Sequence, residues 1–315
     1  MTALPALADR IRRLPGVAAK ADIAVVAEVF GEGDWYFGPG DDGAVLPSGD
    51  GHVVVGGEAM LPAFVAADPY GAGVAAVLAN VNDLAAMGAR PVALLDTIVG
   101  PRAMAREALR GMRWAGRRYD VPVVGGHLTV ADGPPSLSAF GIGRADQVLS
   151  ARNAESGHAL VLGCCLDGAM RPDFLFFRSF DERGERQAGD VRLLADLAAS
   201  GAALAAKDVS MAGMIGSLAM LLESRRLGVT LDLDDVPVPP GVSLPDWLSC
   251  FPCYAFLVTT TMERESACLT GFRDRGLTAR RLGVLDDSGL VKLRQGDDVV
   301  TVFDLSREGV TNLHG

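Results

Sequence analysis

Four acidic side chains lie close together in the first third of the sequence, in three different backbone settings. Asp41 and Asp42 follow a glycine and proline loop that includes Gly40, Glu58 follows a predicted strand, and Asp83 lies on a predicted helix. Mg²⁺ in proteins usually takes one or two carboxylates together with the phosphates of a substrate. Glycine in the preceding loop would let a ligand approach the backbone closely. The pattern therefore predicts a metal and phosphate site.

The predicted helix that carries Asp83 has a continuous apolar stripe at helical spacing, which consists of Val74, Val77, Leu78, Val81, Leu84 and Ala85. Asn80 and Asp83 fall off this stripe, so they are predicted to point away from the core, toward water or a ligand. The strand predicted over 52–56 places Glu58 at its carboxyl end, where ligands of open α/β sheets collect.

Each acid also has a simpler interpretation. An Asp-Asp pair in a loop most often forms a turn or caps a helix, and an acid on a polar helix face is most often solvated. Only the combination of these four acids favours a metal and phosphate site.

Composition excludes several classes of function. The chain has 315 residues, a formal net charge of −10 and a pI of about 4.9, which argues against nucleic acid or an acidic membrane surface as the main partner. No apolar run is long enough to cross a bilayer. The phosphate-loop pattern that ends in Gly-Lys-Ser/Thr is also absent from the sequence.

Five cysteines form an odd set in a chain without a signal-peptide pattern, which predicts a reduced, cytoplasmic protein. Cys250 and Cys253 form a lone C-x-x-C motif. A redox role is the alternative, but thiols buried as small hydrophobic groups are favoured.

The order of predicted elements indicates an α/β (α+β) protein with two domains, 1–150 and 151–315, joined near a polar segment at 153–157. The first domain is predicted to contain strands over 52–56, 91–99, 121–124 and 136–143 and a helix over 102–119. For the second domain we predict helices over 193–206 and 214–225 and strands over 158–163, 255–261, 277–285 and 299–304.

Further candidate residues follow the predicted elements. Gly125 and Gly126 end the predicted strand 121–124, where they would allow close approach of a ligand to which His127 could bind. Asp208 and Ser210 precede a predicted helix, where capping and contact with an anion or metal are both open.

Arginines recur along one side of the predicted helix 102–119, at positions 102, 106, 110, 113 and 117. This stripe could face a phosphate-bearing ligand. In an acidic protein a solvated helix face is the favoured interpretation.

The sequence resembles the AIR synthase superfamily in four motifs that occur in family order over nearly the whole chain. The motifs are Gly40-Asp-Asp-Gly-Ala44, Asn82-Asp-Leu-Ala-Ala-Met-Gly-Ala-Arg-Pro91, Val124-Gly-Gly126 and Asp208-Val-Ser-x-x-Gly213. The resemblance implies an AIR synthase-like fold of two domains. It further implies a homodimer formed by a mixed sheet in the N-terminal domains, and a cleft for ATP and Mg²⁺.

The same resemblance implies roles for individual residues and an ATP-dependent phosphoryl transfer to a small polar substrate. The metal ligands would be Asp41 or Asp42, Glu58, Asp83 and Asp208, and His127 and Asp208 would act in catalysis. Nucleotide-binding residues would be Gly40, Asp41, Gly57, Asn80, Asn82, Gly125, Gly126 and Ser210.

Departures from the family pattern point to a branch of unassigned activity. Thiamine-monophosphate kinases carry acids where this chain has His127 and Met211. Selenophosphate synthetases carry an early reactive cysteine, whereas the first cysteine here is Cys164, and the hydrogenase maturation dehydratase carries a C-terminal cysteine tail that is absent from 311–315.

Two rival interpretations remain. Gly71 and Gly73 at a helix start, with Asp96 further on, partly match a dinucleotide-binding fingerprint, but the strand does not run directly into the first glycine. The second rival interpretation is a non-catalytic subunit that binds a nucleotide or takes part in an assembly.

Overall fold

The computed structural model describes residues 3–31 and 39–313, so Gly38 of the predicted loop lies outside the described residues. The helices are α1 (Leu4–Arg12), α2 (Pro15–Ala18), α3 (Ala24–Phe30), α4 (Pro62–Ala67), α5 (Pro69–Ala86), α6 (Arg102–Tyr119), α7 (Phe180–Arg183), α8 (Gln187–Asp190), α9 (Leu193–Ala199), α10 (Gly213–Glu223), α11 (Leu244–Ser249) and α12 (Glu265–Asp274). The 3₁₀ turns are η1 (Ala21–Ile23), η2 (Ala151–Asn153), η3 (Gly184–Arg186) and η4 (Leu233–Asp235).

The strands are β1 (Ala44–Pro47), β2 (His52–Met60), β3 (Arg90–Gly100), β4 (Val123–Val130), β5 (Ser136–Ala145), β6 (Ala159–Cys164), β7 (Ala169–Met170), β8 (Phe176–Arg178), β9 (Ala205–Asp208), β10 (Gly228–Asp232), β11 (Phe251–Pro252), β12 (Ala255–Thr260), β13 (Thr278–Asp286), β14 (Leu290–Gln295) and β15 (Asp298–Asp304). The mixture of helices and mixed sheets confirms the predicted α/β class.

The chain forms two compact units that are not continuous in sequence. One contains residues 42–148 and 183–196, and the other contains 1–41, 149–182 and 197–315. The predicted division at 150/151 lies next to the change at Leu149, but it differs for two segments. The first 41 residues group with the C-terminal half, and 183–196 group with the N-terminal half.

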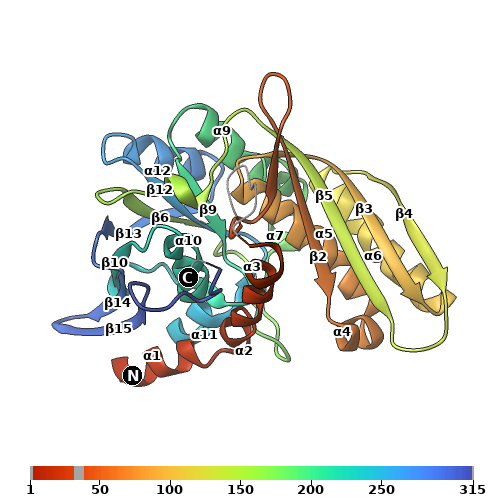
Figure 1. Ribbon diagram of the computed structural model, residues 1–315, viewed down its shortest axis with the longest axis horizontal. Coiled ribbons are helices and arrows are strands. Elements are labelled where there is room, and N and C mark those ends of the chain that lie inside the picture. The colour runs from red at the N-terminus through yellow and green to blue at the C-terminus, as the bar shows by residue number, and fades with distance from the viewer. Residues whose placement is uncertain (1–2, 32–38, 314–315) are drawn as a thin grey trace. The chain divides into compact units, whose positions relative to one another are not determined.

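The unit built on 42–148 contains a mixed sheet with the order β1-β2-β5-β3-β4, in which β3 and β4 are parallel and the other neighbours antiparallel. Helix α5 packs on β2, β5 and β3, and α6 packs on α5, β3 and β4 (Figure 1). Both helices therefore cover one face of the sheet.

Glycines allow α5 and α6 to pack closely. A Cβ at Gly73 would lie 2.0 Å from the carbonyl oxygen of Ala108, and a Cβ at Gly111 would lie 2.0 Å from that of Tyr70. Because real Cβ atoms do not approach backbone so closely, the two helices can pack at this distance only with glycine at both positions.

The second unit contains a seven-stranded sheet with the order β15-β14-β10-β13-β6-β12-β9 and a small sheet β11-β8-β7. Its core packs α10 and α1 with buried strand residues such as Leu160, Leu257 and Leu293. The N-terminal helix α1 contacts β15 and α10, and this packing is why the first residues belong to this unit.

Several predicted element bounds are wrong. Strand β2 continues to Met60 and β4 runs from Val123 to Val130, so Glu58 and the Gly125-Gly126-His127 run lie inside strands rather than after them. The helix predicted over 193–206 ends at Ala199, and Ala205–Asp208 forms β9. Consequently Asp208 ends a strand and does not directly precede a helix.

Candidate metal and nucleotide site

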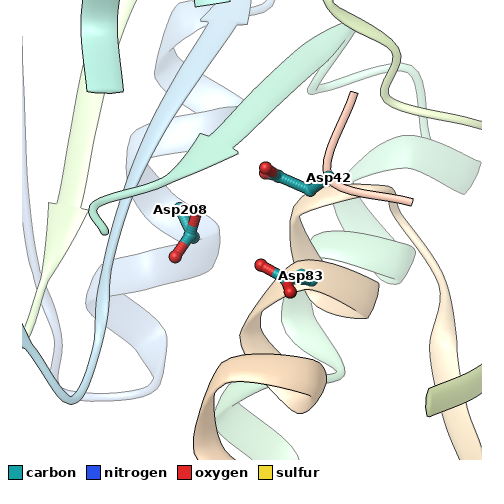
Figure 2. Close-up of side chains that lie close together, drawn as sticks. All are labelled: Asp42, Asp83 and Asp208. Carbon is teal, nitrogen blue, oxygen red and sulfur yellow. The ribbon is translucent and has the colours of Figure 1, made fainter. Parts of the chain in front are cut away.

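Asp42 and Asp83 come together within one unit. Ligand oxygens of the two carboxylates lie within 4.8 Å of one another, and Figure 2 shows both groups directed to the same side. Asp42 precedes β1 in a bend, and Asp83 lies in the last turn of α5. Opposite ligands of an octahedral Mg²⁺ are about 4.2 Å apart, so this pair fits two positions on one cation after small side-chain adjustments.

The position of Asp83 on α5 is electrostatically unfavourable for an anion. Its side chain is 8% exposed, and the helix ends three residues later at Ala86. The C-terminus of a helix carries partial negative charge, which disfavours a carboxylate there by roughly 0.3–1 kcal/mol. A bound cation would instead be attracted to the partial negative charge at this end of the helix, so the arrangement suits a metal.

Asn80 does not face water or a ligand, contrary to the prediction. Its side chain is fully buried, and its Nδ2 donates to the carbonyl oxygens of Ala76 at 2.8 Å and of Ala139 on β5 at 3.2 Å. A Cβ at Gly141 would lie 3.2 Å from the Asn80 Oδ1. The asparagine therefore joins α5 to the sheet, and the neighbouring Asn82, 1% exposed, is buried on the same helix.

Asp41 has a different environment from Asp42. Its Oδ1 accepts a hydrogen bond of 2.8 Å from the Ala151 backbone N–H, and it groups with the other unit. Burial raises the pKa of the Asp41 carboxyl, against the lowering effect of hydrogen bonds from Ser150 and Ala151 and of the charges of Arg152 and Lys207. Between the two adjacent acids, the geometry favours Asp42 as a ligand.

The remaining candidates of this unit lie on different faces of the sheet. Gly57 pairs with Phe140, and a Cβ there would lie 2.8 Å from the Phe140 ring. Gly125 pairs with Leu95 and His127 with Thr97, which places Gly57, Gly125 and His127 on the face opposite α5, because side chains alternate along a strand. His127 is exposed, and its Nε2 lies 3.3 Å from the Thr129 hydroxyl.

Glu58 and Gly126 lie on the face that α5 and α6 cover. Glu58 is half-buried within β2, paired with Ala139, and is not among the acids that cluster with Asp42 and Asp83. A Cβ at Gly126 would lie 2.6 Å from the Asp96 Oδ2, so this glycine makes room for a buried carboxyl. Burial raises the pKa of Asp96.

In the second unit Asp208 forms a buried ion pair with the adjacent Lys207, and the two residues are 3% and 5% exposed. Ser210 follows, and its backbone N–H donates to the Ser217 hydroxyl at 3.0 Å. Lys207 is a charged residue that sequence reasoning did not select. The sequence offered little reason to select Lys207, apart from the small number of lysines in this chain.

The glycines of the dinucleotide pattern and the cysteines of the C-x-x-C motif have structural roles. The backbone N–H of Gly71 is capped by Asp68, and Gly73 packs on α6, so neither glycine forms a dinucleotide loop. The cysteines are all free and buried, and burial raises the pKa of Cys250 and of Cys253 to about 12. Such thiols are poor nucleophiles at neutral pH.

Comparison with known proteins shows the family. Residues 40–145 match the model of the AIR synthase related protein N-terminal domain, and 179–295 match that of the C-terminal domain. The chain is 31% identical over 308 residues to the uncharacterized protein sll0787 of Synechocystis sp.. The matched region covers 95% of each of the two chains. This chain belongs to the AIR synthase related family.

Two solved structures share the fold. T. maritima PurL complexed with ADP has a TM-score of 0.75 at 20% identity over 86% of this chain, and AaThiL complexed with AMPPCP and TMP has a TM-score of 0.68 at 17% identity over 92%. The match spans 46% of the PurL chain and 99% of the AaThiL chain. In the part of the chain that the structure describes, no helix is long and apolar enough to cross a membrane.

Proposed function

We propose that this protein is an ATP- and Mg²⁺-dependent enzyme that activates a small polar substrate by phosphoryl transfer. The observation that carries the proposal is the convergence of Asp42 and Asp83 within 4.8 Å, with Asp83 in the last turn of α5. Support also comes from the shared fold, since T. maritima PurL has been solved with ATP and with ADP.

In this proposal Asp42 and Asp83 hold Mg²⁺. Asp208, which the family motif also selects, is proposed as a further metal ligand. When bound, Mg²⁺ neutralises the phosphate charge that develops during phosphoryl transfer. Asn80 and Asn82 keep the last turns of α5 packed in the core, which holds Asp83 in position. Lys207, which forms an ion pair with Asp208, is the charged residue we propose for contact with a phosphate group.

Calorimetry with MgATP tests this proposal. Wild-type protein should bind MgATP, and binding should weaken strongly in EDTA. Asp83→Asn should lose at least tenfold in affinity, because a ligand charge is removed while the side-chain shape is kept. Asp132→Asn, in the exposed β4–β5 loop, removes the same charge away from the site and is the matched control.

Two results would contradict the proposal. Equal affinity of Asp83→Asn and wild type, with both folded by circular dichroism, would remove Asp83 from the site. ATP binding without turnover in a screen for phosphorylated products would instead favour the alternative of a non-catalytic nucleotide-binding or assembly subunit. The solved HypE-HypF complex, which has a TM-score of 0.69, includes a protein of this fold in an assembly.

We further propose that the open face of the sheet pairs with a second copy of the chain. No helix among the described residues of this unit packs on that face, and its exposed apolar side chains include Phe140 and Val99. His127 would then lie at the interface, and this is the role we propose for it in place of the catalytic role that the family resemblance implies.

Sedimentation velocity tests the pairing. Phe140→Asp places a charge in the centre of the open face and should convert a dimer to a monomer. Val299→Asp, at an exposed apolar position in the other unit, should leave the dimer intact. A wild-type monomer at micromolar concentration would rule out the pairing.

A further inference from the structure

Helix α6 concentrates positive charge in an acidic protein. It carries six arginines and one glutamate, in a chain of net charge −10. A cavity of about 850 Å³ opens beside its C-terminal half, and Arg110, Arg113, Arg117 and Arg118 line it together with Trp114 and Tyr70. This volume falls within the range of small-molecule sites.

The cationic character of the cavity is only partly neutralised by neighbouring acids. Arg110 has Glu107 at 3.1 Å, but Arg113 and Arg117 have no carboxylate within 4.0 Å among the described residues. Two acids, Asp120 and Glu185, line the cavity beside its four arginines. Arg192 holds Asp120 by donating to its carbonyl oxygen at 2.9 Å, and lies 3.8 Å from its carboxylate. Clustered guanidinium groups therefore produce a positive potential in a concave surface, which attracts anions.

The walls of the cavity are fixed by contacts that do not need a ligand. The Arg118 guanidinium lies 4.9 Å from the centre of the Trp114 ring, which orients both groups. The opposite wall comes from η3 and α8. There, Arg183 and Asp190, each 1% exposed, form two hydrogen bonds of 2.7 and 2.8 Å. This buried pair anchors the wall to the same unit as α6.

A second cavity, of about 720 Å³, shares Arg113, Arg117 and Asp120 with the first but is otherwise lined mainly by apolar residues, including Leu109, Met112 and Val121. These two arginines thus separate a cationic, aromatic hollow from an apolar one. A ligand that satisfies both has an anionic group for the guanidiniums and an apolar or aromatic body. Planar guanidinium groups suit phosphate in particular, because they can donate two parallel hydrogen bonds.

We propose that the arginine cavity of α6 binds a small organic phosphate whose phosphate group is held by Arg113 and Arg117. The site is distinct from the Asp42 and Asp83 pair. Tyr70 lies in the first turn of α5 and Asp83 in its last turn, 13 residues later, a separation of about 20 Å along the helix. The two acids that line the cavity, Asp120 and Glu185, are not part of a candidate metal group among the described residues, so binding there is independent of Mg²⁺ and of the function proposed above.

Calorimetry in EDTA with phenyl phosphate and inorganic phosphate tests the assignment. Phenyl phosphate should bind saturably and more tightly than inorganic phosphate. Arg113→Gln/Arg117→Gln should weaken binding at least about tenfold, since each charge-assisted hydrogen bond contributes on that order. Arg113→Lys/Arg117→Lys, which keeps the charge but loses the planar fork, should give an intermediate affinity.

Matched controls separate the cavity from general charge effects. Arg102→Gln/Arg106→Gln removes the same charge from exposed positions on the same helix outside the cavity and should bind like wild type. Asp83→Asn should bind phenyl phosphate with wild-type affinity, even though its affinity for MgATP is expected to fall.

The proposal is overturned by any of three results. The first is the absence of saturable binding of either phosphate. The second is an equal loss in both double glutamine variants, which would mean unspecific attraction. The third is tighter binding of a poly-glutamate peptide than of phenyl phosphate, with loss in Arg113→Gln/Arg117→Gln, which would assign the surface to an acidic protein partner.

Discussion

Replacing Asp190 by asparagine is expected to destabilise the unit that contains α6 by about 3–5 kcal/mol, the usual cost of removing one partner from a buried ion pair. Asp190 and Arg183 are each 1% exposed and are joined by two hydrogen bonds. The asparagine has nearly the same shape, so little packing is lost. The cost arises because the Arg183 guanidinium stays in the core without the carboxylate that balanced its desolvation.

The pair of Arg171 and Asp173 provides a control with the same geometry at the surface. Arg171 donates to both oxygens of Asp173 at 3.0 and 2.8 Å, but the Asp173 side chain is 63% exposed. Asp173→Asn should leave the unfolding midpoint unchanged within error, because water solvates both groups when the pair breaks. Arg183→Met/Asp190→Leu, which removes both buried charges, should recover most of the stability that Asp190→Asn loses.

Urea unfolding followed by circular dichroism measures the free energies, and amide hydrogen exchange of 183–196 reports the segment itself. Asp190→Asn should also weaken phenyl phosphate binding, because η3 and α8 form a wall of the arginine cavity. A loss of less than about 1 kcal/mol, equal to that of Asp173→Asn, would refute the argument from burial.

Three further predictions follow from particular contacts. Gly73→Ala should cost about 1–3 kcal/mol in urea unfolding, since its Cβ would meet the Ala108 carbonyl oxygen at 2.0 Å, and a cost below the smaller value would mean that the helices separate easily. Burial raises the pKa of Asp41 above its unfolded value of 3.8, so the folded state binds more protons and stability falls as pH rises above that value. Asp41→Asn, which keeps the acceptor for Ala151, should therefore gain stability relative to wild type as pH rises above 3.8, whereas a constant difference would contradict the shift. Glu223 accepts from the Val310 and Thr311 backbone N–H groups at 2.6 and 3.1 Å, so Glu223→Gln should speed hydrogen exchange at 310–313 without changing exchange in α5.

The fold class, the family and the long helices follow from the sequence alone. Helix 102–119 was predicted with its observed bounds, because a strong apolar period and a flanking proline define it locally. Strands 255–261 and 299–304 agree with the observed strands to within one residue. Patterns that repeat within one element depend on local chemistry, and sequence alone is sufficient for them.

Which of the candidate residues lie together depends on how the elements pack, and this could not be predicted from the sequence. Asn80 and Asp83 share one side of α5 by periodicity, yet Asn80 bonds to Ala139 on β5 and Asp83 lies close to Asp42. Sequence spacing could not separate them, because α5 is buried nearly all round and has little apolar asymmetry. The pairing of strands likewise placed His127 on the face opposite Gly126 and Asp96.

The arginine cavity shows the same limit. The arginine stripe was visible in the sequence, and a solvated face was the favoured interpretation. The wall formed by 183–196 comes from a distant part of the chain and is held by a buried Arg183 and Asp190 pair. Contacts between residues so far apart depend on how complete elements pack, and no local pattern encodes them.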